Sequence, residues 1–411
     1  MTRRGAPARE RVPQVPRDPY GIGPVSGYVG PVLAVIALVL IALFTLSLMN
    51  GQIPFIRTGS PGGGGDGGNG DGATPSPAPS NVVITVPAAV FPGSITYAKA
   101  GNIWVQSGTD AHQVTNTGND SMPTFSADGQ WIYFIRVENS GARFPSTGSY
   151  YDLSTPVLIQ VHSDGTGAKR LLTGTFKQGV YKWFYWLRQP VPSPDGKTIA
   201  VISDGPNPLQ SDIVLHMFNI ASKKLTSLNV PESLQLGHQD PAWRPDGKFL
   251  LYVKNGRDAT RGAPQIYRYE LATKKTKALT GPGYVAPAYS PDGAWIAATR
   301  TDAFGTDIAI LDSAGKEVLR VTDDSHSFSP IWSPAGNAVA FLHLQGTIVD
   351  LRMATLDDST GQWTVTATVD LTKVSALDGV SRPSWYVPPS DLPSASGAPN
   401  AGGSPAASTA P

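Results

Sequence analysis

Short apolar runs separated by polar turns recur along the middle of this chain. Five of them contain mainly β-branched, aromatic and small apolar residues, and each follows a glycine: residues 131–135, 198–202, 249–253, 295–299 and 338–342. Runs of this length and composition, bounded by turn residues, are typical of β-strands. The pattern therefore predicts an all-β fold built from hairpins.

The turns before these runs share one sequence, close to Ser-Pro-Asp-Gly, at residues 126–129, 193–196, 244–247, 290–293 and 333–336. Proline presets the backbone for a turn, aspartate bonds nearby backbone, and glycine accepts a positive φ without a steric penalty. The repeated aspartates Asp128, Asp195, Asp246 and Asp292 are therefore expected to form turns and not to act as catalytic acids.

Each unit continues with a third apolar run and a fourth short segment that ends in a hydrophobic residue and threonine. Four strands per unit form the blade of a β-propeller. The first strands begin at Pro123, Pro190, Pro241, Pro287, Pro330 and Pro383. Most of these spacings lie near the roughly 40–50 residues of a propeller repeat. The longer first spacing predicts insertions at residues 137–151 and 177–186.

The two ends of the repeat array are incomplete in complementary ways. Residues 94–115 supply three strands without a first strand, and residues 382–387 supply a first strand alone. Joined together they complete a sixth blade and remove the exposed sheet edges of an open array. The sequence therefore predicts a six-bladed β-propeller over residues 83–388, closed by strands from both ends.

The Ser-Pro-Asp-Gly turn, the Ile-Ala-like strand after it and the Leu-Thr end of each unit resemble the WD40-like propeller repeat of TolB. The resemblance covers residues 94–387 and implies the propeller fold. TolB is a periplasmic partner of a peptidoglycan-associated lipoprotein and carries an additional N-terminal domain, which is not evident in this sequence. The resemblance therefore implies the fold and leaves the function open.

The N-terminal part predicts a membrane anchor. No charged residue occurs between Asp18 and Arg57, and residues 28–50 are long and apolar enough for a transmembrane helix. Five arginines and two acidic residues precede the span, so residues 1–27 are expected in the cytoplasm and the propeller outside the membrane. Residues 51–82 read as a Gly/Pro-rich linker, and residues 389–411 as a disordered Ser/Pro/Ala tail.

Composition excludes several classes of function. The chain has no cysteine, which removes disulfides and thiolate chemistry, and its net charge of +1 gives no electrostatic footprint for nucleic acid. No nucleophile elbow, phosphate-binding loop or zinc-protease motif is present. The sequence therefore predicts no catalytic residue and no cofactor.

Candidate binding residues are those that do not repeat. In a propeller, the connections between blades lie at one mouth of the central channel, and concave mouths favour ligands. Side chains that could converge there are Asp120, Arg188, His238, Asp240, Tyr284, His326 and Arg382. The repeated aromatics Phe125, Trp243, Tyr289, Trp332 and Trp385 are expected to pack between blades. The dense aromatic segment 181–186 either packs an insertion or presents a binding surface.

Three functions remain open at this point. The leading prediction is a non-enzymatic, single-pass membrane protein whose extracytoplasmic propeller binds or scaffolds a protein, peptide or envelope glycan. The alternative is an extracytoplasmic metal-dependent carbohydrate-active enzyme, a lyase or hydrolase, with His238 and His326 as metal ligands. A weaker alternative is a sensor that signals through the arginine-rich tail.

Overall fold

The computed structural model describes residues 91–143, 146–208, 212–228, 230, 237–255 and 264–392. All of them belong to one compact unit, Val83–Pro411. The predicted cytoplasmic tail (1–27), transmembrane helix (28–50) and linker (51–82), and most of the predicted C-terminal tail, lie outside the described residues. Within the described part of the chain, no helix is long and apolar enough to cross a membrane.

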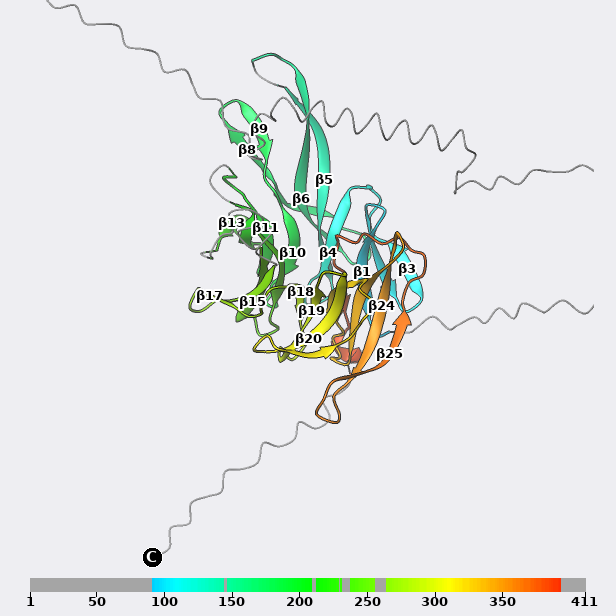
Figure 1. Cartoon of the computed structure of the whole chain (residues 1–411). Coiled ribbons are helices and arrows are strands. Elements are labelled where there is room, and N and C mark those ends of the chain that lie inside the picture. Colours follow the sequence, from blue (N-terminus) through cyan, green and yellow to red (C-terminus); the bar gives the residue numbers. More distant parts are fainter. Residues whose placement is uncertain are drawn as a thin grey trace, which may run out of the picture. The chain divides into compact units, whose positions relative to one another are not determined.

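Six four-stranded antiparallel sheets form the blades of a propeller (Figure 1). Blade 1 contains β4 (Asp120–Phe125), β5 (Trp131–Arg143), β6 (Tyr150–His162) and β7 (Lys169–Thr173), and blade 2 contains β10 (Arg188–Pro192), β11 (Thr198–Ser203), β12 (Val214–Asn219) and β13 (Lys224–Ser227). Blade 3 contains β14 (His238–Trp243), β15 (Phe249–Lys254), β16 (Gln265–Glu270) and β17 (Lys275–Ala278). The sheet order confirms the predicted four-stranded repeat.

The remaining blades follow the same order. Blade 4 contains β18 (Tyr284–Tyr289), β19 (Trp295–Thr301), β20 (Thr306–Asp312) and β21 (Glu317–Arg320), and blade 5 contains β22 (Ser327–Trp332), β23 (Ala338–Gln345), β24 (Ile348–Asp357) and β25 (Thr364–Asp370). Blade 6 contains β26 (Ser384–Tyr386), β1 (Ser94–Lys99), β2 (Asn102–Ser107) and β3 (Asp110–Gln113), and a short 3-10 helix, η1 (Pro389–Asp391), follows β26.

Blade 6 closes the ring as the sequence predicts. Strand β26 pairs antiparallel with β1, and Ile95 lies opposite Trp385. The Trp385 indole N–H donates to the carbonyl of Pro92 at 2.8 Å, and its ring meets Phe91 edge-on with the ring centres 5.6 Å apart. Residues close to the two ends of the propeller sequence, such as Ile95 and Trp385, thus share one sheet and one core.

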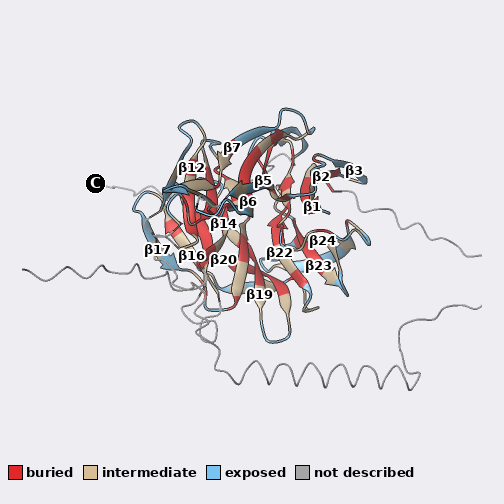
Figure 2. Cartoon of the chain, turned by 90° about the horizontal axis from the view of Figure 1, so that it is seen from above, coloured by how far each residue is buried: buried red, intermediate tan, exposed pale blue. Residues whose placement is uncertain are grey.

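Apolar side chains between neighbouring blades form the core, which Figure 2 shows as buried strand segments around the ring. Ile308 and Ile310 of blade 4, for example, pack with Val339, Phe341 and Trp332 of blade 5. Because both faces of an inner blade strand are covered, these strands read as continuous apolar runs in the sequence. The expected role of the repeated aromatics in packing is confirmed.

Both predicted insertions are present. Strands β5 and β6 extend far beyond the other blades, and β8 (Thr175–Gln178) pairs with β9 (Tyr181–Phe184) in a separate hairpin beside them (Figure 1). The Tyr151 hydroxyl donates to the carbonyl of Lys182 at 2.9 Å, and the rings of Tyr151 and Trp183 lie 6.0 Å apart. The aromatic segment therefore packs one insertion against the other.

Strand direction gives the propeller two different ends. The first strand of each blade runs toward the Ser-Pro-Asp-Gly-like turn, so all of these turns gather at what we call the turn end. The connections between blades and those between second and third strands gather at the opposite end, the loop end. The β5–β6 and β8–β9 hairpins both project there (Figure 1).

Candidate functional site

Six equivalent residues surround the channel, each directly before the proline that opens a blade. This channel belt consists of Met122, Gln189, Asp240, Ala286, Ser329 and Arg382. The first five have φ values between 49° and 57°, a left-handed conformation that is uncommon outside glycine. At each of these five the pairing of first and second strands shifts register, as in a β-bulge. The left-handed conformation recurs in five blades and is therefore a feature of the fold.

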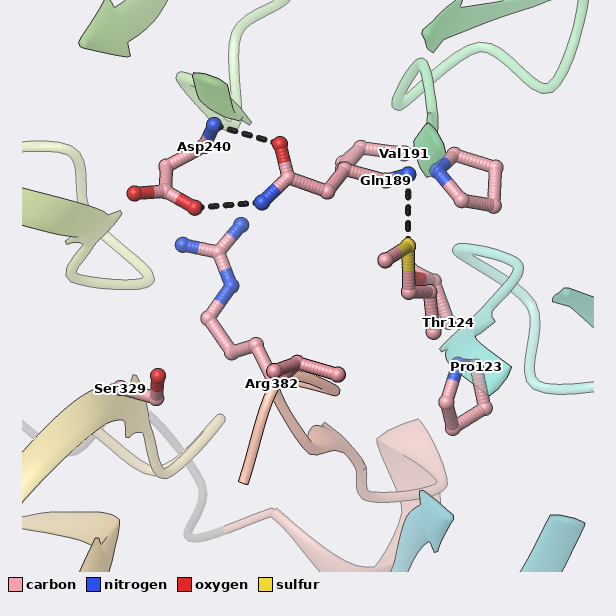
Figure 3. Close-up of a pocket in the computed structure, with 10 residues that line it drawn as sticks. Pro123, Thr124, Gln189, Val191, Asp240, Ser329 and Arg382 are labelled. Carbon is pink, nitrogen blue, oxygen red and sulfur yellow. Dashed lines mark hydrogen bonds between the residues drawn. The ribbon is translucent and has the colours of Figure 1, made fainter. Parts of the chain in front are cut away.

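The bulges turn the backbone N–H group of a belt residue toward the belt side chain of the preceding blade (Figure 3). Gln189 N–H donates to the Met122 sulfur at 3.2 Å, and Asp240 N–H donates to Gln189 Oε1 at 2.8 Å. Ala286 N–H donates in turn to Asp240 Oδ2 at 3.0 Å. Blades 1 to 4 are thereby joined in series around the axis by hydrogen bonds that use belt side chains.

Arg382 occupies the sixth position of the belt and reaches across the channel. Its Nη1 donates to the carbonyl of Pro287 at 2.7 Å and its Nη2 to the carbonyl of Pro241 at 2.9 Å. Burial lowers the pKa of Arg382, and the nearby Asp240 carboxylate opposes that shift. Since arginine stays protonated in proteins, the channel holds a permanent cation that ties blade 6 to blades 3 and 4.

On the loop side of Arg382 the channel narrows to a cavity of about 40 Å³, lined by Met122, Gln189, Asp240, Ser329, Val380 and Arg382 among others. This space fits little more than a few water molecules. Two predicted site residues, Asp240 and Arg382, do converge here, as Figure 3 shows. The narrow cavity is part of the structural joint between blades and is too small for an organic ligand.

On the turn side the channel widens into a cavity of about 460 Å³, which we call the aromatic bowl. Its wall includes Phe125, Trp243, Tyr289, Trp332 and Trp385, and Arg382 lines it as well. The sequence predicted a packing role alone for these aromatics. Their shared position, three residues after the belt on five of the six first strands, was the signal that they also surround the axis.

Two of the next three predicted site residues, Asp120 and Tyr284, serve local structure instead. Asp120 accepts two hydrogen bonds from Arg136, at 2.6 and 2.8 Å, and this pairing raises the pKa of Arg136. The Tyr284 hydroxyl donates to Glu317 at 2.6 Å, and burial together with that carboxylate raises the pKa of Tyr284 to about 12. Arg188 is exposed. All three lie at the starts of first strands, two or one residues before the belt.

The two histidines of the metal hypothesis have separate environments. His238 is buried, accepts the Leu215 N–H on Nδ1 at 3.2 Å and packs on Tyr252 with the ring centres 4.7 Å apart. His326 is exposed in blade 5, where its Nδ1 contacts the carbonyl of Asp324. Among the described residues, no three His, Cys, Asp or Glu side chains are placed to hold a metal ion.

A Ser/His/Asp group in blade 5 has the composition of a catalytic triad but not its geometry. Ser327 Oγ lies 3.2 Å and Asp324 Oδ2 3.3 Å from the same nitrogen of His343, Nδ1. A triad requires the acid and the nucleophile on opposite nitrogens of the ring. Ser327 has no exposed surface, and its hydroxyl donates to Asp324 at 2.8 Å. The group fixes a strand and leaves no exposed nucleophile.

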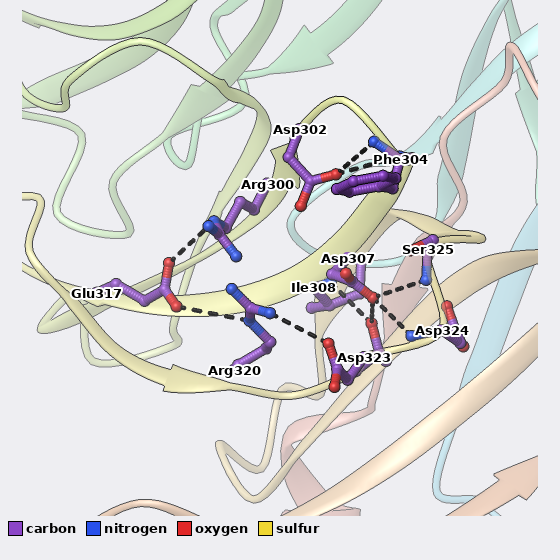
Figure 4. Close-up of polar contacts among 12 residues, drawn as sticks. Arg300, Asp302, Phe304, Asp307, Ile308, Glu317, Arg320, Asp323, Asp324 and Ser325 are labelled. Carbon is purple, nitrogen blue, oxygen red and sulfur yellow. Dashed lines mark hydrogen bonds and ion pairs between the residues drawn. The ribbon is translucent and has the colours of Figure 1, made fainter.

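Aspartates fix the connections between blades at the loop end (Figure 4). Asp307 Oδ1 accepts the backbone N–H groups of Asp324 at 2.9 Å and Ser325 at 3.1 Å. The outer surface of the same blade carries partly exposed ion pairs, including Arg320 with Asp323 at 3.1 Å. Such exposed pairs contribute little stability, whereas the Asp307 bonds fix a loop that would otherwise leave backbone donors unpaired.

Comparison with known proteins agrees with the architecture. A family model described as the TolB beta propeller domain matches residues 157–385. TolB of Anaeromyxobacter dehalogenans is 34% identical over 94 residues, covering 22% of this chain and 21% of that protein. An uncharacterised protein of Agrobacterium fabrum is 27% identical over 150 residues, covering 35% of this chain and 47% of that protein. The chain thus spans less than half the length of these curated relatives.

Among solved structures, TolB from Acinetobacter baumannii superposes with a TM-score of 0.51 at 17% identity, covering 71% of this chain and 66% of that chain. At this level of identity the likeness shows the fold alone. It is consistent with the sheet order and the ring closure described above.

Proposed function

Because the chain belongs to the TolB beta propeller domain family, we propose that it is a non-enzymatic binding module that engages a protein partner at the loop end. One observation carries the proposal, which is the distribution of exposed apolar side chains. The propeller would act outside the cell membrane, tethered by the apolar N-terminal span at residues 28–50. The arginine-rich sequence before that span supports this orientation.

Exposed apolar side chains gather at one end of the propeller. Of the seven large hydrophobic side chains exposed among the described residues, six lie on loop-end connections: Tyr150, Val180, Trp186, Phe304, Val374 and Val380. Their exposed fractions run from 44% for Trp186 to 89% for Phe304. The seventh, Val318, lies on the outer strand β21. The turn end carries none within the described part of the chain.

Concentrated exposed apolar surface on a soluble domain is costly and marks an interaction site when it is not scattered. Charges of both signs stand among these side chains: Arg143 stacks on the Tyr150 ring at 4.2 Å, and the Asp302 carboxylate accepts the Phe304 N–H at 2.8 Å (Figure 4). Aromatic anchors within a mixed-charge surface are typical of protein interfaces. A nucleic acid would instead require a uniformly basic surface.

The relatives support a partner of this kind. The match from Anaeromyxobacter dehalogenans is named as a Tol-Pal system protein, which indicates work within a multi-protein system for that relative. The loops that differ between blades lie at the loop end, and differing loops on a regular scaffold are where binding specificity resides. The carbohydrate-active alternative has no specific observation in its favour among the described residues.

The proposal is tested by measuring partner recovery with purified full-length protein in detergent. Phe304→Ser combined with Val374→Ser is expected to weaken recovery of the partner about tenfold or more, since buried anchors dominate interface energy. Val318→Ser removes an exposed apolar side chain away from the loop end, although a less exposed one at 41%, and is the control. Equal recovery by the double variant and the control would contradict the proposal.

A further inference from the structure

We infer that the aromatic bowl is a second binding site, for a ligand that joins a carboxylate to an apolar body and places the carboxylate on Arg382. The site lies at the turn end and is independent of the loop end. It can therefore be occupied whether or not a protein partner is docked.

Aromatic and proline side chains form much of the wall of the bowl. Equivalent first-strand positions contribute Phe125, Pro192, Trp243, Tyr289, Trp332 and Trp385. The Trp243 indole N–H is already bonded to the carbonyl of Val191 at 3.1 Å, and that of Trp385 to Pro92. Trp243 and Trp385 therefore offer carbon surface and no free donor, whereas the buried Trp332 indole N–H has no hydrogen-bond partner among the described residues. The volume of about 460 Å³ falls within the range of small-ligand pockets.

Arg382 supplies the polar contact. A guanidinium carries five N–H donors, and the protein carbonyls of Pro241 and Pro287 use one each on two different nitrogens. No other hydrogen bond from Arg382 occurs within the described residues, and this partly buried residue lines the bowl. The remaining donors match the planar, bidentate geometry of a carboxylate.

The nearby acidic groups do not cancel this cation on the bowl side. Asp240, the closest acidic partner, lines the narrow cavity and not the bowl. The turn aspartates stand outside the wall, where Asp195 pairs with Lys197 at 3.8 Å and Asp246 with Arg244 at 3.6 Å. Their charges are exposed to water and screened, whereas Arg382 is partly buried beside aromatic and proline side chains, where electrostatic attraction is stronger.

Two sources share the required chemistry, the carboxyl terminus of a peptide with an apolar last residue and a small aromatic acid. Calorimetric titration of the full-length protein distinguishes them with two matched pairs: acetyl-Gly-Phe against its C-terminal amide, and phenylacetate against phenylacetamide. Each acid that binds is expected to bind about tenfold or more tightly than its amide, since charge-assisted hydrogen bonds contribute that difference. Binding by the peptide acid alone identifies chain ends, and equal binding by phenylacetate identifies small acids.

Two variants complete the test. Arg382→Gln removes the charge and is expected to abolish the preference for acids, while Ala288→Phe, at a half-exposed position in the wall, fills the bowl and leaves Arg382 in place. Both should weaken acid binding about tenfold or more, and Ala288→Phe should leave partner recovery at the loop end unchanged. The inference is overturned if neither acid saturates the protein by roughly 10 mM, if acid and amide bind equally, or if Ala288→Phe binds as the wild type does.

Discussion

The two ends of the channel are built from the same repeat and differ in almost every surface property. At the turn end the six blades place equivalent residues in register, and their aromatic rings enclose the bowl above Arg382. At the loop end the connections differ in length from blade to blade and expose Phe304, Val374 and other apolar side chains to solvent. The repeated positions therefore produce a pocket lined by aromatic rings, and the connections that do not repeat produce a surface with exposed apolar side chains.

Because of this difference, we expect residues at the turn end to determine stability and residues at the loop end to determine recognition. Aromatic residues at the turn end contribute to the blade interfaces as well as to the bowl, so their removal affects folding. Aromatic residues at the loop end are exposed, so their removal affects contacts with other molecules. Substitutions of the same chemical type at the two ends should therefore have opposite consequences, which the following experiments test in order of effect size.

Trp385→Ala should have the largest effect. The side chain is only 9% exposed and belongs to the strand that closes the ring, so its loss is expected to lower the free energy of unfolding by about 4 kcal/mol. Trp186→Ala at the loop end is the matched control, because Trp186 is 44% exposed and should change stability by less than about 1 kcal/mol. Chemical denaturation measures both, and similar losses would show that the two ends are not distinct.

Arg382→Met should be next in size. The substitution removes both hydrogen bonds to the carbonyls of Pro241 and Pro287, and it leaves Asp240 without its cation. We expect a loss of about 3 kcal/mol in unfolding free energy. Arg188→Met, an exposed arginine, should stay within about 0.5 kcal/mol of the wild type. An equal effect at both sites would mean that the belt does not join the blades.

Phe304→Ser should change stability least among the aromatic substitutions. The ring is 89% exposed, so its removal takes little buried surface from the fold. The free energy of unfolding, measured by thermal denaturation, should change by no more than about 0.5 kcal/mol. Partner recovery is expected to fall at the same time. A large stability loss would place Phe304 in a packing role and would weaken the contrast between the two ends.

His343 should give a small pH effect. Burial, followed by the Arg352 charge, lowers the pKa of His343 in the folded state, while Asp324 and Asp370 act in the opposite direction. Its neutral form is therefore favoured by folding, so the contribution is complete above the unfolded pKa near 6.5 and is lost as pH falls through the folded pKa. Denaturation at pH 7.5 and pH 5 should show His343→Asn losing less stability than the wild type over that interval. Identical slopes would contradict the assignment.

Most of the fold could be predicted from the sequence. The Pro-Asp-Gly turns fixed the hairpins, and the missing first strand before Ser94 matched the lone strand at Trp385. Both signals are local, since turn chemistry and strand patterning depend on neighbouring residues. The insertions at the β5–β6 and β8–β9 hairpins followed from the one long spacing between repeats.

The site was less accessible to prediction, because convergence depends on distances between blades. Asp240 and Arg382 were predicted and do meet, whereas Asp120 and Tyr284 found partners within their own blades. Met122 and Gln189 were overlooked, although they directly precede the repeated prolines. The left-handed bulge that turns them toward the axis requires knowledge of strand pairing, which local sequence does not contain.

Photo-cross-linking of the protein in intact cells tests the contrast between the two ends most directly. A photoreactive amino acid would replace Phe304 or Val374 at the loop end, and Asp195 at the turn end or Val318 on the outer strand. One discrete protein adduct is expected at both loop-end positions, none at Val318, and no adduct with that same protein at Asp195. An adduct at Asp195 with none at Phe304 and Val374 would contradict a docking surface at the loop end.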